Sequence, residues 1–338
     1  MKNFNDYIKS IKEGTDLSEN ESENAFDQIL LQKVNEDEII DFLTSLSKKG
    51  ENVDEIFGAV LSIKKKANII KGFSNSFDTC GTGGDETGTF NISTITAIIT
   101  AACGVCVAKH GNKAVSSLTG SADVLSELGI NINLDEKNII NCLNKINLCF
   151  LFAPNFHPIL KNVAEVRKKI GKRTIFNILG PLLSPVECKK QIIGVYNVNI
   201  LMRVAEVLKK LETEHTWVVS GNKEYDELTT TGKNYIVEIK KNKIQELEID
   251  SNNFGLKKSN KEDLIGGDSK ENAEIIKGIL KGEISGSKKD VVLLNAASAL
   301  YINKIANDIK SGIQIANESI LSGKALNKLN ELIEFSNS

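Results

Sequence analysis

Residues 77–94 read FDTCGTGGDETGTFNIST, and they join a predicted strand at 77–79 to a helix that opens at 89–94. Glycines lack Cβ atoms, so the backbone N–H groups between the two elements can approach an anion closely. The N-terminus of the following helix adds partial positive charge. The segment therefore predicts a cradle for phosphate or pyrophosphate, with a plain turn as the competing interpretation. It is not a Walker A loop, because no Gly-Lys-Ser/Thr follows.

The apolar pattern around this segment alternates between strand and helix spacing. Predicted strands cover 77–79, 105–108, 149–152, 192–196 and 216–220, and predicted helices cover 121–128, 155–170, 200–211 and 290–305. The longest apolar run, 95–108, predicts a buried helix followed by a strand, and 234–250 predicts an antiparallel hairpin. This alternation is typical of an α/β fold with a mostly parallel central sheet flanked by helices.

The first 72 residues carry helical spacing only, as at Phe26, Ile29 and Leu30. We therefore predict a small all-helical domain at 1–72 and a larger α/β domain at 73–338. The run 95–108 is shorter than the roughly 18–20 apolar residues that span a bilayer. The N-terminal residues contain no apolar signal sequence. We expect a cytoplasmic protein that is not bound to a membrane.

Composition and charge exclude several classes of protein. Lys and Arg number 42 against 44 Asp and Glu, a formal charge of −2, so no electrostatic footprint for nucleic acid is present. The 41% hydrophobic content excludes a disordered or collagen-like chain. Six cysteines are too few for a disulfide scaffold, and Cys103 and Cys106 are interpreted as small buried residues.

A second polar segment, KHGNKAVSS at 109–117, follows the predicted strand at 105–108 and runs into GSAD at 120–123. Lys109 and Lys113 are suited to meet phosphate oxygens as point charges, and Ser117 can add a hydrogen bond. His110 is a candidate for proton transfer. The competing interpretation is a solvated loop whose Ser121 or Asp123 caps a helix.

A third segment carries His157, Arg167 and the run GKRTIFNILGPL at 171–182. If 155–170 is one helix, His157 and Arg167 lie nearly three turns apart and face one cleft from different depths. Arg167 is then a bidentate clamp for a carboxylate, with a surface arginine and a capping histidine as the alternative. Asp226 and Glu227 follow the strand at 216–220 and are suited to hold Mg²⁺, or are simply solvated. Together the segments predict a Mg²⁺-dependent enzyme with one phosphorylated substrate and a second, anionic one.

In this order, the motifs GTGGD with FNIST, KHGN, GSAD, RTIFN with LGP, and the acidic pair closely resemble the anthranilate phosphoribosyltransferase family. The family belongs to the nucleoside phosphorylase/phosphoribosyltransferase fold. The resemblance implies transfer of 5-phosphoribosyl from 5-phosphoribosyl-1-pyrophosphate (PRPP) to the amine of anthranilate with release of pyrophosphate. This is the second step of tryptophan synthesis from chorismate. It also implies a later helical excursion near 165–190 and a homodimer that contacts through the helical domains.

The resemblance assigns residues to each ligand. It implies PRPP contacts at Gly81, Thr82, Gly83, Gly84, Asp85, Thr89, Asn91, Ser93, Thr94, Lys109 and Ser121. Anthranilate is expected at Gly81, His110, Asn112, His157 and Arg167, and Mg²⁺ at Ser93, Asp226 and Glu227. The expected catalytic residues are Lys109, His110 and Arg167.

Three positions depart from the family pattern, which often has Lys at Leu118, Pro at Glu165 and Gly at Glu86. Two alternatives remain open from the sequence. A pyrimidine nucleoside phosphorylase resembles this fold but has less use for the acidic metal pair. A non-catalytic nucleic-acid-binding relative would be expected to have a basic surface.

Overall fold

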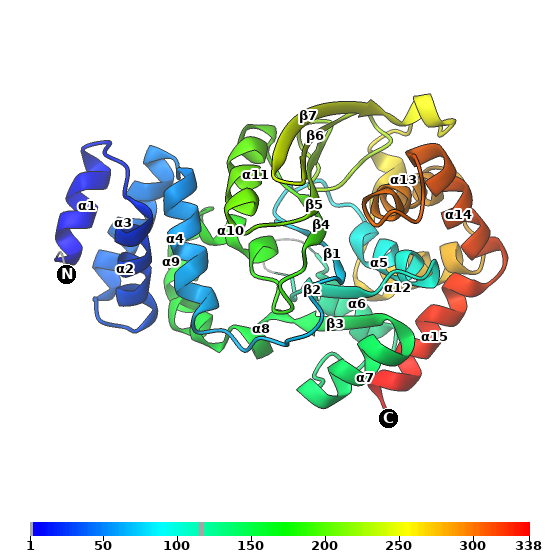
Figure 1. The fold of residues 1–338 in the computed structure, drawn as a ribbon, viewed down its shortest axis with the longest axis horizontal. Coiled ribbons are helices and arrows are strands. Elements are labelled where there is room, and N and C mark those ends of the chain that lie inside the picture. Colours follow the sequence, from blue (N-terminus) through cyan, green and yellow to red (C-terminus); the bar gives the residue numbers. More distant parts are fainter. Residues whose placement is uncertain (1–2, 115–117) are drawn as a thin grey trace.

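The computed structural model describes residues 3–114 and 118–338, so the predicted hydrogen bond of Ser117 lies outside the described residues. A bundle of four N-terminal helices lies at one end of the molecule, beside a sheet covered by helices (Figure 1). The helices are α1 (Phe4–Lys12), α2 (Glu19–Leu30), α3 (Glu36–Lys49) and α4 (Val53–Lys64). The predicted helical domain and the larger α/β domain are both present, whereas the exact boundary near residue 72 stays a prediction.

The sheet has seven strands in the order β3-β2-β1-β4-β5-β6-β7. The strands are β1 (Phe77–Gly81), β2 (Val107–Gly111), β3 (Leu148–Phe152), β4 (Lys190–Gly194), β5 (His215–Gly221), β6 (Lys233–Lys240) and β7 (Lys243–Asp250). The first five run parallel, and β6 and β7 form the predicted antiparallel hairpin. The mostly parallel sheet is thereby confirmed. Strand order reverses between β1 and β4, which is where open α/β sheets bind ligands.

The two faces of the sheet belong to two separate cores. Ile192, Val219 and Ile236 point into one core, and their neighbours Ile193, Val218 and Val237 point into the other. Adjacent strand residues face opposite sides of a sheet, so this alternation follows from the strand period. The first core includes α5 (Ile92–Ala102), α13 (Ser287–Ile302) and α15 (Lys324–Ser336). The second includes α11 (Leu201–Lys210) and the helical domain.

Each helix of the N-terminal bundle begins after a capping residue. Asn3, Ser18, Asn35 and Asn52 each accept a backbone hydrogen bond at the start of α1 to α4, in four capping boxes. The chain returns to the bundle at α9 (Ala164–Ile170) and α10 (Phe176–Leu179), where the ring of Phe176 lies 5.8 Å from that of Phe26. The later helical excursion therefore packs on the N-terminal bundle.

The predicted continuous helix at 155–170 is wrong. The chain instead forms α8 (Ala153–Phe156), a 3₁₀ helix (Pro158–Val163) and α9. Pro158 has no N–H to donate and its ring restricts the preceding residue, which leaves helical geometry at φ −123° and ψ 57°. His157 therefore sits at a break, and its orientation is independent of the axis of α9.

The remaining helices are α6 (Ser121–Glu127), α7 (Glu136–Ile146), α12 (Ser269–Leu280) and α14 (Ile309–Leu321). Predicted helices at 121–128, 200–211 and 290–305 are confirmed within a few residues as α6, α11 and α13. Among the described residues, no helix is both long and apolar enough to cross a bilayer.

Candidate active site

The glycine-rich segment forms an open loop beyond the end of β1, at the point where the strand order reverses. Thr82 N–H donates to the Gly194 carbonyl at 2.9 Å, and Gly83 N–H donates to Asp226 Oδ2 at 2.6 Å. Within residues 3–114 and 118–338, no group accepts the N–H of residues 84, 85 or 86. Unpaired amides on a loop of this kind form an anion-binding concavity. The loop therefore offers free donors where the sequence predicts a phosphate cradle, and the binding of phosphate itself stays a prediction.

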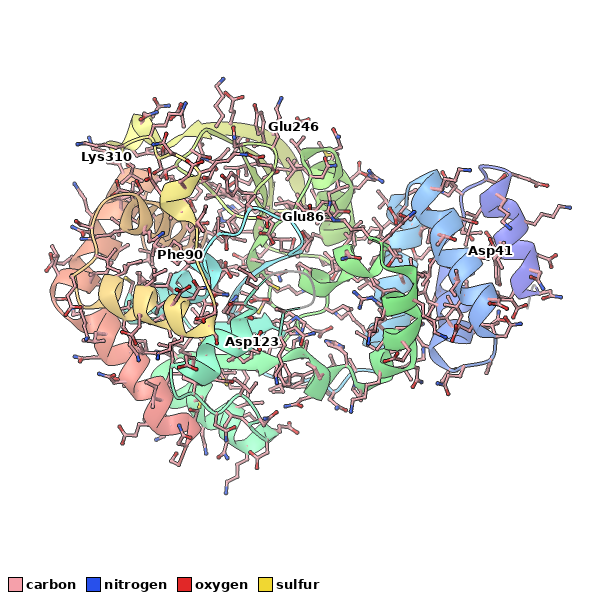
Figure 2. All side chains as sticks on the ribbon, turned by 180° about the vertical axis from the view of Figure 1, so that it is seen from behind. Asp41, Glu86, Phe90, Asp123, Glu246 and Lys310 are labelled. Carbon is pink, nitrogen blue, oxygen red and sulfur yellow. The ribbon has the colours of Figure 1, made fainter. Side chains whose placement is uncertain are left out.

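The loop lines a cleft of about 280 Å³. The cleft is bordered by Gly84, Asp85, Glu86, Gly88, Thr89, Leu118, Thr119, Gly267 and Asn272. Leu118, where the family often has Lys, is 83% exposed at its rim. Figure 2 shows Glu86 on the side of the α/β domain that faces the helical domain.

Two glycines let the acidic segment approach the strand ends. A Cβ on Gly194 would lie 1.4 Å from the Asp226 carbonyl oxygen, and a Cβ on Gly81 would lie 2.2 Å from Asp226 Oδ2. The Asp226 backbone therefore rests directly on the end of β4. This close approach brings the acidic pair beside the glycine loop.

Gly194→Ala is expected to displace the Asp226 segment and to lower the free energy of unfolding by about 2 kcal/mol or more, because the clash is with backbone atoms. Urea denaturation measures the change. Gly180→Ala is the matched control, since a Cβ there meets nothing within 4 Å. Equal stability changes in the two variants would contradict the close approach.

Three carboxylates lie close together beside the loop. Asp85 Oδ2 accepts a hydrogen bond from Asp226 N–H at 3.4 Å, and Glu227 Oε1 accepts one from Ser93 N–H at 3.2 Å. Burial and the negative charge of Asp85 raise the pKa of Asp226 to about 7. Burial and the charge of Asp226 raise the pKa of Glu227 well above its ordinary value. The positive charge of Lys109 opposes the rise in the pKa of Glu227 but does not cancel it.

The donor chemistry of this group fits Mg²⁺. Glu227 Oε2 is buried and has no hydrogen-bond partner within the described part of the chain. Hard oxygen ligands of this kind are what Mg²⁺ prefers, together with its retained waters. The described side chains do not, however, form a group of three or more His, Cys, Asp or Glu poised around one metal position. Asp226 and Glu227 thus supply oxygen donors suited to Mg²⁺ without forming a complete metal site, and their role as metal ligands stays a prediction.

Lys109 is buried between the glycine loop and the start of α5. Its Nζ donates to the Thr79 carbonyl at 2.6 Å and to Ser93 Oγ at 3.3 Å. An ammonium group carries three donors, so one remains for a ligand. Thr94 follows Ser93 in α5, and its hydroxyl is buried with no partner within residues 3–114 and 118–338. The start of α5 thus carries polar groups with unused hydrogen-bonding capacity.

His110 and His157 meet from different segments, with ring centroids 5.4 Å apart. Burial lowers the pKa of His110 to about 3 and that of His157 to about 4, so both rings are neutral at pH 7. His157 Nε2 lies 2.8 Å from the Leu183 carbonyl, which only accepts, so Nε2 carries the proton. The ring of His110 is likewise buried, next to the backbone of Gly180.

Between about pH 6.5 and 8, the metal-free protein is expected to lose stability as the pH rises. Burial raises the pKa of Asp78 and Asp226 to about 7, so the folded state holds protons that the unfolded chain has released. The stability from these protons is complete below about pH 4 and is lost as the pH rises to about 7 and slightly beyond. The slope is about 1.4 kcal/mol per pH unit for each proton that only the folded state holds, so it diminishes as these carboxyls ionise above pH 7.

The pKa values of His110 and His157 are lowered, so below about pH 6.5 these residues make the protein more stable as the pH rises. This gain offsets the loss from the carboxyls there, and the net loss of stability is expected only above about pH 6.5. Urea unfolding in EDTA at several pH values measures the slope. A free energy of unfolding that stayed constant or rose across this range would contradict the assigned pKa shifts.

Arg167 lies on α9 and presents a guanidinium without an anionic partner. Its charge stacks over the Phe176 ring at 5.2 Å, and burial lowers the pKa of the group. No hydrogen bond or ion pair joins its guanidinium to another described residue. A largely buried, unpaired cation is costly unless a ligand completes it. The two histidines contact each other, and among the described residues no hydrogen bond, ion pair or ring contact joins Arg167 to either one.

The remaining predicted residues surround the loops. Ser121 Oγ donates to the Asn112 carbonyl at 3.3 Å, and Asn112 itself is exposed. Asn91 Nδ2 donates to the Thr119 carbonyl at 3.3 Å. Thr89 pairs with Ile265 in an isolated antiparallel β-bridge outside the seven-stranded sheet. All of these lie near the cleft or the loops that border it, while their contacts to substrate stay predictions.

Sequence reasoning missed Asn272, a buried residue of α12. Its Nδ2 donates to Asn91 Oδ1 at 3.0 Å, and its Oδ1 accepts from Gly267 N–H at 2.8 Å. Asn272 thereby orients the Asn91 amide from a segment 181 residues away. The signal was the glycine pair at 266–267 before a helix, which repeats the pattern of the first loop.

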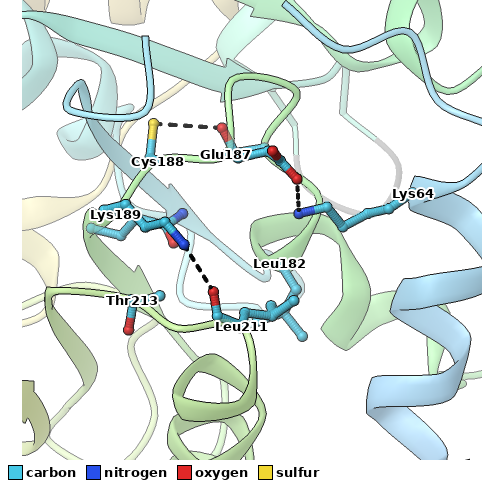
Figure 3. A pocket seen from close by; sticks show the side chains of 9 residues that line it. Lys64, Leu182, Glu187, Cys188, Lys189, Leu211 and Thr213 are labelled. Atoms are coloured by element: carbon cyan, nitrogen blue, oxygen red, sulfur yellow. Dashed lines mark hydrogen bonds and ion pairs between the residues drawn. The ribbon is translucent and has the colours of Figure 1, made fainter. Parts of the chain in front are cut away.

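A second, smaller hollow of about 70 Å³ lies at the opposite end of β4 (Figure 3). Lys64 pairs with Glu187 at 2.8 Å across it, and Lys189 Nζ donates to the Leu211 carbonyl at 3.3 Å. None of the predicted site residues lines it. Its lining comes from Lys64 at the end of α4 and from the α/β domain, and it is not part of the candidate site.

Comparison with known proteins places this geometry in a family. Residues 74–326 match the a/b domain of a glycosyl transferase family, and residues 5–67 match the helical bundle domain of a glycosyl transferase family. Anthranilate phosphoribosyltransferase of Acetivibrio thermocellus is 46% identical, covering 98% of this chain and 96% of that protein. The enzyme of Petrotoga mobilis is also 46% identical, over 99% and 97%. This chain belongs to the anthranilate phosphoribosyltransferase family.

Solved structures of the family share the fold. The enzyme of Thermus thermophilus superposes with a TM-score of 0.92 at 34% identity, covering 98% of this chain and 100% of that one. The Saccharomyces cerevisiae enzyme in complex with PRPP and Mg has a TM-score of 0.91 at 28% identity, over 99% and 98%. The same yeast enzyme has also been solved with 4-fluoroanthranilate. The family resemblance in the sequence and the fold are thereby confirmed.

Proposed function

We propose that this chain transfers the 5-phosphoribosyl group of PRPP to the amine of anthranilate and releases pyrophosphate. The observation that carries the proposal is the open cradle of free amides beside carboxylates that need a cation. Such a pairing suits a Mg²⁺-bound pyrophosphate better than a lone phosphate. Relatives at 46% identity carry the same activity in their names.

The donor side stabilises the leaving group. Breaking the C1–O bond of PRPP builds positive charge on the ribose and negative charge on pyrophosphate. The N–H groups of residues 84–86 and the spare N–H of Lys109 are already in place for that negative charge, so little reorganisation accompanies the reaction. Asp226 and Glu227 would hold Mg²⁺ with Ser93, and the ion would supply charge neutralisation at the pyrophosphate.

The acceptor side positions anthranilate. Arg167 would bind the carboxylate through its unpaired guanidinium, and the neutral His110 and His157 would line the path to the ribose. An aromatic amine is neutral near pH 7, so it attacks C1 without prior deprotonation. After attack the nitrogen is strongly acidic, and even a His110 with a pKa of about 3 suffices as acceptor of its proton. His110 therefore accepts the proton after the C–N bond has formed, so its basicity contributes little to the rate of attack.

The test is loss of anthranilate fluorescence after mixing purified protein with anthranilate, PRPP and Mg²⁺, with pyrophosphate measured in step. We expect the signal to fall only when all three components are present. A reaction that proceeds with phosphate and a nucleoside instead would support the phosphorylase alternative. The homodimer through the helical domains and the cytoplasmic location stay predictions.

A further inference from the structure

Arg173 is one of only three arginines in the chain, and the proposed chemistry gives it no role. It lies on the connection between α9 and α10 and reaches across to the glycine loop. Its guanidinium stacks over the Tyr196 ring at 4.3 Å. From there, Nη2 donates to the Gly84 carbonyl oxygen and pairs with Glu86 Oε1 at 3.2 Å. The Arg173 side chain thus contacts the glycine loop at both Gly84 and Glu86.

The bond to Gly84 determines where the next amide points. In a planar trans peptide, the carbonyl of one residue and the N–H of the following residue point in opposite directions. Because Arg173 holds the Gly84 carbonyl, the N–H of Asp85 must point away from Arg173. That N–H is one of the free donors of the cradle, and Asp85 lines the cleft. Arg173 therefore orients an anion-binding donor without approaching the anion itself.

The other side of this contact is anchored to the sheet. Tyr196 follows β4, and its N–H donates to Thr82 Oγ1 at 3.2 Å. The ring that supports Arg173 and the start of the glycine loop are thus connected through one residue. A guanidinium stacked on an aromatic face keeps its donors in a fixed plane, which the flexible ammonium of lysine does not do.

Glu86 has a backbone conformation that is unfavourable for a residue other than glycine. The residue has a left-handed φ of 60°, a conformation that costs a non-glycine residue free energy and persists only where contacts enforce it. Its carboxylate is 81% exposed, so the ion pair with Arg173 contributes little by itself. The carbonyl bond and the stacking are then the contacts that maintain the loop.

We propose that Arg173 is a positioning residue for the phosphoribosyl donor, which sets the orientation of the 84–85 peptide and hence the affinity for pyrophosphate. This inference rests on the proposed function. Arg173 lies six residues after Arg167 on the same short segment of the helical excursion. Movement of that segment would therefore change the acceptor-binding arginine and the donor cradle together.

The experiment compares Arg173→Ala with Lys172→Ala, which removes an exposed positive charge from the adjacent position. Calorimetry measures binding of PRPP with Mg²⁺, and steady-state kinetics measure KM for each substrate. We expect Arg173→Ala to weaken PRPP binding about tenfold or more and to raise KM for PRPP in parallel. KM for anthranilate should stay within about threefold, and Lys172→Ala should match the wild type within about twofold.

Three further measurements separate positioning from general stability. Guanidinium chloride at millimolar concentration is expected to restore part of the PRPP affinity of Arg173→Ala, and Arg173→Lys should be intermediate. Glu86→Gln should change PRPP affinity by about threefold at most, because its ion pair is exposed. The Tm of Arg173→Ala should lie close to that of Lys172→Ala.

Unchanged PRPP binding in Arg173→Ala, or a loss that Lys172→Ala reproduces, would overturn the positioning role. Equal losses for PRPP and anthranilate together with a lowered Tm would also overturn it, since they indicate a structural role. A wild type that binds PRPP but does not consume anthranilate would refute the proposed function alone. Binding of PRPP by the variants would then still decide the role of Arg173.

Discussion

Asp226→Asn combined with Glu227→Gln is expected to lower kcat/KM for PRPP by about 10³-fold and to abolish the response to Mg²⁺. Asn and Gln keep the shape and the hydrogen bonds to Gly83 N–H and Ser93 N–H. They remove the negative charges that would hold the cation. Pyrophosphate release measured against Mg²⁺ concentration gives the result.

The same pair of substitutions is expected to stabilise the metal-free protein. Burial raises the pKa of both carboxyls, as do the charge of Asp85 on Asp226 and the charge of Asp226 on Glu227, so the ionised pair destabilises the folded state near pH 8. Neutral amides remove that cost, and we expect a Tm several degrees higher in EDTA. Mg²⁺ should raise the Tm of the wild type and leave that of the variant unchanged.

Glu224→Gln is the matched control, because Glu224 lies in the same loop and pairs with Lys261 at 2.8 Å on the surface. It should retain the activity and the Mg²⁺ response of the wild type. A double variant that kept its Mg²⁺ dependence would show that the acidic pair does not hold the metal. If the Tm of the double variant in EDTA were lower than that of the wild type, the two carboxyl groups would stabilise the metal-free fold.

The α/β architecture could be predicted because its signals are local. The apolar run at 192–196 overlaps β4, and the run at 216–220 lies within β5. The helices of the N-terminal bundle begin after capping residues such as Ser18 and Asn35. The glycine loop was likewise recognisable, since glycines between a strand and a helix have few other uses. These features need only neighbouring residues for their explanation.

The break at His157 shows where periodicity misleads. Apolar residues recur at helical spacing from 155 to 170, and this spacing predicts a continuous helix despite Pro158. Proline tolerates the first turn of a helix but interrupts one already begun. The consequence is functional, because the break turns His157 toward His110, and their ring centroids lie 5.4 Å apart. Pro158 is therefore a stronger signal of a helix boundary than the apolar spacing is of a continuous helix.

Contacts between distant segments could not be predicted. Asn272 orients Asn91 across 181 residues, and Arg173 reaches Gly84 across 89. Neither residue carries a local signal of its partner, since the pairing arises when α12 and the α9–α10 connection pack near the glycine loop. The sequence identified the ligand-binding segments, whereas the residues that orient them became visible only in three dimensions.

Arg167→Ala is expected to lower kcat/KM for anthranilate by about 10²-fold or more, with PRPP binding changed by about threefold at most. Removing the guanidinium would leave the substrate carboxylate without its partner in a largely buried site, and that loss weakens acceptor binding specifically. Arg167 makes no ion pair with another described residue, so its removal should not destabilise the fold. Steady-state kinetics with each substrate varied in turn measure both effects.

Lys168→Ala supplies the control for charge, since Lys168 is exposed on the same helix. Its kinetics should match those of the wild type. An aniline-type acceptor that lacks the carboxylate provides a second comparison, because Arg167→Ala should lose little activity toward it relative to the wild type. If the variant lost activity equally toward both acceptors, or lost PRPP and anthranilate affinity to the same extent, Arg167 would not be the carboxylate ligand. The unpaired cation on α9 would then have to serve the donor, as Arg173 does on the same segment.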